Sequence, residues 1–208
     1  MEDNKVSSCL MLAVGLYTPV DLSCLFEPED LKDTGVELDS HITLFYSQGN
    51  IIPYENLMND IKTVLGDDWN SFNKTMMTTN QRNVIDFFEL SSFENDSDYI
   101  ILKLKKETDL YDRLRTINKG LRNKYNIKST FNEYIPHITL AELKPGYASK
   151  YLNSPNLELV LKDSKVDIED FMISYNEKQR FLTNYKCVDR YFRLQEIKRE
   201  REELDKAE

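Results

Sequence analysis

The two histidines of this 208-residue chain lie in the same tetrapeptide, His-Ile-Thr-Leu, which occurs at His41–Leu44 and again at His137–Leu140. At ordinary residue frequencies, a chance match of the residues after both histidines is expected on the order of once in a thousand comparisons or less often. Imidazole titrates near neutral pH, so two of them can act as acid and base in one reaction. We therefore interpret the repeat as a pair of acid–base groups.

The phase of the repeat decides which side chains can act together. Each copy is apolar and β-branched, which is typical of a strand. Because side chains alternate across a strand, His41 shares a face with Thr43, and His137 shares a face with Thr139. The isoleucine and leucine of each copy point the other way. We predict that these two histidines and two threonines are catalytic, and the sequence does not decide which histidine is the base.

A metal site is the other common use of histidine. The sequence has two histidines in all and no Cys-x-x-Cys or His-x-x-x-His spacing, and threonine is a poor third ligand for zinc. A role in packing alone leaves the matching threonines unexplained. We therefore predict acid–base chemistry with no metal and no cofactor.

Composition and cysteine use indicate a soluble intracellular protein. With 40% hydrophobic and 11% aromatic residues, the chain can bury a core of its own. Its three cysteines, Cys9, Cys24 and Cys187, lack motif spacing, which favours reduced thiols. The acidic first residues and the short apolar run 9–17 fit neither a signal peptide nor a membrane span. We expect a cytoplasmic monomer with no membrane partner, located in the host cytoplasm if the protein is viral.

The net charge of −9 limits the partners that we expect. Proteins that follow a long duplex neutralise many phosphates with Lys and Arg, and an overall negative field opposes that encounter. A small nucleotide in a pocket is compatible with this charge. The middle of the chain is locally basic, which we interpret as a solvated helix face, with phosphate binding as the alternative. The basic residues of this run are Lys103, Lys105, Lys106, Arg113, Arg115, Lys119, Arg122, Lys124 and Lys128.

Hydrophobic periodicity predicts alternating strands and helices in one domain. Period-two patterns predict strands at 9–17, 41–46, 84–90, 99–105, around His137, and at 157–161, 168–175 and 185–194, with a hairpin loop at 91–98. Helical spacing predicts helices that begin at Pro53 and stop at Gly66, and that cover 108–125. We predict one α+β domain over 1–194, in which two related lobes bring both histidines to a shared groove. A charged tail follows over 195–208.

The two His-x-Thr motifs, about a hundred residues apart, resemble those of the 2H phosphoesterases, which are named for that pair of histidines. The more specific copy reads Tyr-Ile-Pro-His-Ile-Thr-Leu-Ala over Tyr134–Ala141. The resemblance implies a bilobal α+β fold, in which two pseudo-symmetric antiparallel-sheet lobes with outer helices surround a central groove. It also implies metal-independent cleavage of a phosphodiester, with the histidines as the acid–base pair and the threonines donating to the phosphate oxygens.

Aromatic side chains near the motifs are candidates for substrate recognition, because nucleobases stack on them. We predict substrate contacts from Tyr17, Tyr46 and Tyr134, and a phosphate contact from Lys144. Trp69 and Phe131 are further aromatic candidates. Glu142 is left out because, in an uninterrupted strand from His137, it falls on the opposite face.

The motifs indicate a reaction class and say little about the substrate. An acidic, Tyr- and Asn-rich chain is similar to phage members of the family, which favours a cyclic or short oligonucleotide signal of host antiviral defence, as in the anti-CBASS nucleases. The alternative enzyme is a 2',3'-cyclic phosphodiesterase or 2'-5' RNA ligase-like enzyme that processes RNA ends. A third possibility, from another class, is a non-catalytic sponge that sequesters a nucleotide. A pure binder, however, needs donors and has no need of two groups that titrate near neutrality.

Overall fold

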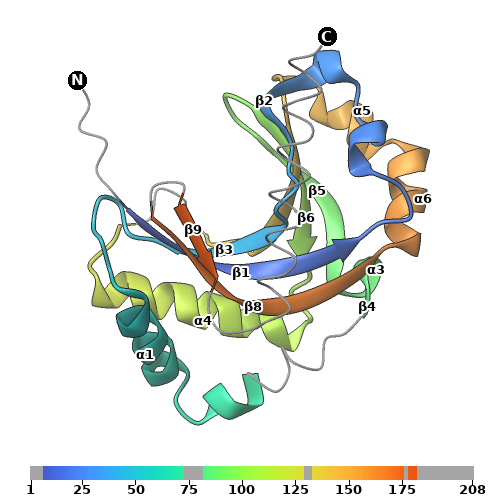
Figure 1. Cartoon of the computed structure of the whole chain (residues 1–208). Helices are drawn as coiled ribbons and strands as arrows, with labels where there is room; N and C mark the ends of the chain where they lie inside the picture. The colour runs from blue at the N-terminus through green and yellow to red at the C-terminus, as the bar shows by residue number, and fades with distance from the viewer. Residues whose placement is uncertain (1–6, 73–81, 129–132, 176–177, 182–208) are drawn as a thin grey trace, which may run out of the picture.

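The two motif strands lie next to each other in the middle of one antiparallel sheet. The computed structural model describes residues 7–72, 82–128, 133–175 and 178–181 (Figure 1). Within them the strand order is β4-β8-β1-β3-β7-β6-β5, with β2 also paired to β7 and β9 to β8. The strands are β1 (Ser8–Tyr17), β2 (Leu31–Val36), β3 (His41–Tyr46), β4 (Arg82–Asn83), β5 (Phe88–Glu94), β6 (Asp98–Leu104), β7 (His137–Leu143), β8 (Lys165–Tyr175) and β9 (Lys178–Phe181).

The sheet curls into a half-barrel, and the helices lie on its outer side (Figure 1). Two long helices, α1 (Tyr54–Leu65) and α4 (Asp109–Lys124), pack against each other, and α4 contacts β3. At the other end, α5 (Ala148–Leu152) packs on β5 and β6, and α6 (Pro155–Asp163) packs on the short α3 (Val84–Phe87). Two 3₁₀ turns cover Leu22–Leu25 and Pro28–Asp30. The α+β prediction is confirmed, and the two lobes share a continuous sheet.

The long helices begin, end and pack as their sequences predict. In α1, the residue before the first turn is Pro53, and the helix ends at Gly66, which adopts a φ of 53° that favours glycine. Gly120 on α4 permits close contact between α4 and α1, because a Cβ there would lie 2.5 Å from a Val64 methyl group. The apolar faces of both helices join the core beneath the sheet.

Two predicted strands are wrong in part or in whole. Residues 84–87 form the turn α3, so the strand of this region begins at Phe88. Residues 157–161 are helical: the Ser154 hydroxyl accepts a hydrogen bond from Leu157 N, and Pro155 occupies the first turn. The hairpin loop is also shorter than predicted, since β5 runs to Glu94 and β6 starts at Asp98. The predicted strand 185–194 and the tail 195–208 lie outside the described residues.

Candidate active site

The structure brings the four predicted catalytic residues together at the junction of β3 and β7. These strands pair antiparallel through Ile42 and Ile138, both fully buried. Continuing this register by one residue places each histidine opposite the threonine of the other copy, where Cβ atoms are about 5 Å apart in a regular pair. The histidines and threonines are half-buried on the face opposite the isoleucines, and both isoleucines belong to the hydrophobic core.

Both imidazoles are held in the same way by the backbone. Nδ1 of His41 lies 2.6 Å from the carbonyl oxygen of Asp39, and Nδ1 of His137 lies 2.7 Å from that of Ile135. A carbonyl oxygen only accepts hydrogen bonds, so each Nδ1 carries a proton and donates. In the neutral ring this leaves Nε2 as the basic nitrogen, and in the charged ring Nε2 becomes a donor. Each histidine can therefore give or take a proton at Nε2.

The surroundings of the two imidazoles differ. The ring of Phe93 on β5 meets the ring of His137 edge-on, with centroids 4.8 Å apart, and Lys103 is the residue of β6 in register with His137. Burial lowers the pKa of His137 below its ordinary value, the hydrogen bond to Ile135 opposes this change, and the nearby His41 lowers the pKa further. In β1 the register neighbour of His41 is the small Ala13.

The two motif strands also share a backbone irregularity, a β-bulge. In each motif strand the leucine is an extra residue with no partner on the neighbouring strand: the β1–β3 register passes over Leu44, and the β6–β7 register passes over Leu140. The carbonyl group of each bulge residue accepts a hydrogen bond from outside the β1–β3 and β6–β7 pairs. Leu44 O accepts from Asn118 Nδ2 at 2.7 Å, and Leu140 O accepts from the backbone N of Glu37 at 2.8 Å.

These two β-bulges return the side chains after the motif to the histidine face. Tyr46 is 53% exposed there, and Glu142 occupies the equivalent position in the second copy. The prediction that Glu142 lies on the face opposite His137 is therefore wrong, because the bulge shifts the alternation of side chains by one residue. Its carboxylate accepts hydrogen bonds from the hydroxyls of Thr34 and, at 3.0 Å, Tyr99; the bond from Thr34 is the main cause of its lowered pKa, and the bond from Tyr99 adds to it.

The other predicted contact residues lie at different distances from the histidines. Tyr17 is 45% exposed at the end of β1, on the face of Ala13 and four residues beyond it, roughly 13 Å along the strand. Lys144 follows the far end of β7, roughly 20 Å along that strand from His137, and its Nζ donates to Glu29 O. The structure therefore does not bring Lys144 to the histidine pair.

Two further aromatic residues are packed in the protein. Tyr134 is half-buried against the core, its hydroxyl donates to Thr43 O at 2.9 Å, and burial raises its pKa. Trp69 stacks on Phe171 with centroids 6.3 Å apart. Phe131 lies outside the described residues.

Sequence reasoning missed two residues that border the motifs, Phe93 and Asn118, and named Lys103 only as part of the basic run. The pairing of β6 with β7 places Lys103 beside His137. Phe93 is in register with Tyr99, and through it with Glu142, so strand register alone does not predict its ring contact with His137. Asn118 interrupts the apolar stripe of α4 and is 9% exposed. A polar residue within a buried stripe is a signal that it has a hydrogen-bond partner.

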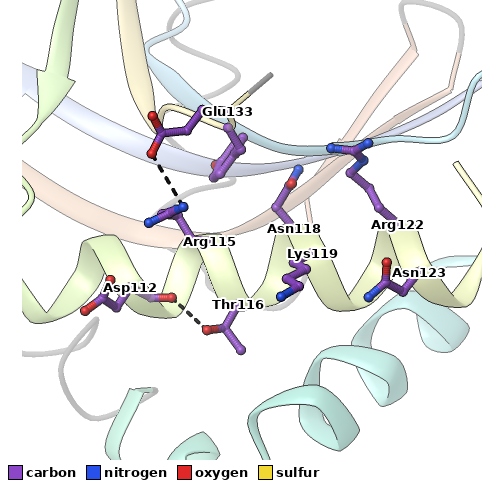
Figure 2. Close-up of a pocket in the computed structure, with 9 residues that line it drawn as sticks. Asp112, Arg115, Thr116, Asn118, Lys119, Arg122, Asn123 and Glu133 are labelled. Atoms are coloured by element: carbon purple, nitrogen blue, oxygen red, sulfur yellow. Dashed lines mark hydrogen bonds and ion pairs between the residues drawn. The ribbon is translucent and has the colours of Figure 1, made fainter. Parts of the chain in front are cut away.

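A cavity of about 500 Å³ lies along α4, next to Glu133 and Tyr134 (Figure 2). No histidine lines it. Its basic side chains include Arg115, which pairs with Glu133 at 3.4 Å, and Arg122, whose Nε donates to Ile127 O at 3.3 Å. Elsewhere in the basic run, Lys103 pairs with Glu89 at 2.9 Å and Lys124 pairs with Asp60. Lys103 lies on β6, so the basic run does not form a single helix face, and the cavity along α4 has mixed charge.

Comparisons with known proteins give a distant similarity in structure alone. No family model matches the chain, and no curated protein matches its sequence. The structure of Kluyveromyces marxianus Usb1 with uridine monophosphate is similar at a TM-score of 0.42 and 11% identity, covering 85% of this chain and 97% of that one. A second structure of Kluyveromyces marxianus Usb1 gives a TM-score of 0.36 and 12% identity over 84% and 96%. At these values the similarity carries no functional argument.

Neither a membrane-spanning helix nor a cluster of metal ligands is found among the described residues. None of the described helices is both long and apolar enough to span a bilayer. Within the same ranges, no three side chains of His, Cys, Asp and Glu gather as metal ligands would.

Proposed function

We propose that this protein is a metal-independent phosphodiesterase of the 2H phosphoesterase type, acting on a small nucleotide. One observation carries the proposal: β3 and β7 present two histidines, each with a threonine in register, at one junction. Both imidazoles donate from Nδ1 to a backbone carbonyl two residues earlier, so both offer Nε2 for proton transfer. Phosphodiester cleavage needs one group that accepts a proton and one that donates it, and imidazole can do either near neutral pH.

The difference between the two histidines supports an assignment of roles. A lowered pKa keeps His137 neutral at pH 7, so its Nε2 is the base that takes a proton from the attacking hydroxyl or water. His41 then donates a proton from Nε2 to the leaving oxygen as its bond to phosphorus breaks. The hydroxyls of Thr43 and Thr139 donate to the non-bridging oxygens, where charge increases in the transition state.

The substrate that we propose is a cyclic or short oligonucleotide signal of host antiviral defence. The acidic chain does not favour a long duplex, and the motif strands form a compact site. Cleavage of 2',3'-cyclic ends of RNA by the same four residues is the second enzymatic candidate. In both cases the reaction is hydrolysis or transfer at one phosphorus atom between the two imidazoles.

Incubation of the purified protein with a substrate panel tests this proposal. The panel contains cyclic di- and trinucleotides, 2'-5' oligoadenylate and 2',3'-cyclic mononucleotides, with products separated by chromatography. We expect linear or monophosphate products from at least one member, with and without EDTA, and none from the double variant His41→Ala/His137→Ala. Recovery of an intact nucleotide from denatured protein, with no turnover of any member, would instead identify a sponge.

A further inference from the structure

Two consecutive carbonyl groups of the first motif accept hydrogen bonds from side chains of the second half of the chain. The Tyr134 hydroxyl donates to Thr43 O at 2.9 Å, and Asn118 Nδ2 donates to Leu44 O at 2.7 Å. Tyr134 lies three residues before His137, and Asn118 lies on α4. Figure 2 shows Asn118 pointing from α4 towards the sheet. Both bonds therefore tie the backbone beside the first catalytic threonine to elements of the other half.

These bonds lie where the sheet offers little other support. β3 and β7 are paired at a single position, Ile42 with Ile138, whereas β1–β3 and β6–β7 are paired along most of their lengths. The position of one histidine relative to the other is therefore set by few ladder bonds. The bulge leaves Leu44 out of the β1–β3 register, and its carbonyl group accepts a hydrogen bond from the Asn118 side chain.

We propose that Tyr134 and Asn118 are positioning residues that fix the first motif strand against the second and so set the alignment of the two imidazoles. This inference rests on the proposed phosphodiesterase function. Neither side chain needs to touch the substrate. Tyr134 is the more direct link, because its side chain bonds to the first motif and its backbone lies three residues before the second histidine. Misplacement of reacting groups by about 1 Å can cost a hundredfold in rate, so the loss of one such bond is sufficient for a measurable effect.

The test compares Tyr134→Phe with a matched control, Tyr111→Phe. Tyr111 lies on α4, is 1% exposed, and its hydroxyl has no hydrogen-bond partner among the described residues. Each variant removes one buried hydroxyl and keeps the ring. We expect Tyr134→Phe to lower kcat about tenfold with KM changed by less than about threefold, and Tyr111→Phe to leave both unchanged. For the second residue, Asn118→Ala is compared with Asn123→Ala, which changes an exposed amide on the same helix.

A change of leaving group separates positioning from a general loss of stability. A nitrophenyl phosphodiester expels nitrophenolate, which needs little protonation, whereas a nucleotide expels an alkoxide that does. If Tyr134 aligns the pair, Tyr134→Phe slows the nucleotide more than the nitrophenyl ester, at a temperature well below the Tm of the variant. Equal losses on both substrates, or kinetics equal to those of Tyr111→Phe, overturn the inference while leaving the phosphodiesterase intact. A wild-type protein that cleaves neither substrate overturns the proposed function itself.

Discussion

The two motif strands share one backbone plan and differ in what surrounds it. In both, Nδ1 of the histidine donates to a carbonyl, and in both the leucine is a bulge residue. The second histidine, however, lies against Phe93 and in register with Lys103, whereas the first has Ala13 as its neighbour on β1. The backbone repeat therefore sets where the imidazoles lie, and burial against the neighbouring strands lowers the pKa of His137. A duplicated motif can thus supply two groups with different roles.

Removal of either histidine is expected to have the largest effect. If each imidazole performs one proton transfer, as we propose, His41→Ala and His137→Ala should each lower kcat by a factor of about 10²–10⁴. The measurement is kcat on whichever nucleotide the panel identifies. A variant that keeps more than about a tenth of the wild-type rate would show that its histidine transfers no proton in the rate-limiting step.

The dependence of the rate on the leaving group distinguishes the acid from the base. If His41 is the acid, the loss caused by His41→Ala should be smaller on a nitrophenyl ester than on a nucleotide, since nitrophenolate departs without a proton. His137→Ala should lose similar factors on both. The reverse pattern would exchange the roles of the two histidines and leave the catalytic pair intact.

The threonines are expected to have the next largest effect. Thr43→Val and Thr139→Val keep the shape and remove the hydroxyl, so each should lower kcat about a hundredfold if the hydroxyl donates to the phosphate in the transition state. The Thr43 hydroxyl also hydrogen-bonds the half-buried Cys9 thiol; burial raises the pKa of this thiol to about 11, the bond to Thr43 opposes that change, and the thiol stays protonated. Thr63→Val, which removes an exposed hydroxyl on α1, is the control. A change in KM alone would assign the hydroxyls to ground-state binding.

Phe93 packs against His137, so its removal is expected to change the pKa of that histidine. Burial is the main cause of the lowered pKa of His137, so Phe93→Ala, which admits water, should raise that pKa towards its ordinary value. The acid limb of the kcat/KM profile then moves to higher pH, provided that His137 is the base. NMR titration reads the pKa directly, because the chain has two histidines and His41→Ala assigns the resonances. Phe87→Ala, on α3, is the control, and an unchanged titration of His137 would contradict this cause.

The sequence was informative where a pattern is local and failed where the structure depends on pairing between strands. The motif strands, α1 and α4 could be predicted, because alternation, helical spacing and end signals such as Gly66 are contained in the segments themselves. The strand predicted at 157–161 is wrong, because Leu157 and Leu161 fit a helix as well as a strand, and Ser154 and Pro155 mark the start of a helix. Glu142 was placed on the wrong face because no local pattern marks a bulge at Leu140.

Prediction of the candidate site from the sequence is limited in the same way. Both histidines and both threonines could be found from repetition alone, whereas Phe93 and Asn118 depend on which strands and helices are neighbours. Lys144 was selected for its position just after the motif strand, but a strand of seven residues separates its ends by roughly 20 Å. Nearness in sequence along a strand is therefore a poor guide to nearness at the site.

The smallest expected effect is on stability, and it tests the environment of His137 without any substrate. Its pKa is lower in the folded protein than in the unfolded chain, where it is near 6.5. The unfolded chain therefore binds more protons between those two values, so the free energy of unfolding falls as the pH drops from about 6.5 through the folded pKa. His137→Gln removes this contribution, and its urea midpoint should fall less than that of the wild type between pH 7.5 and 5.5. Other acidic groups affect both proteins alike, so an equal fall in both would show that His137 is as easily protonated in the fold as in water.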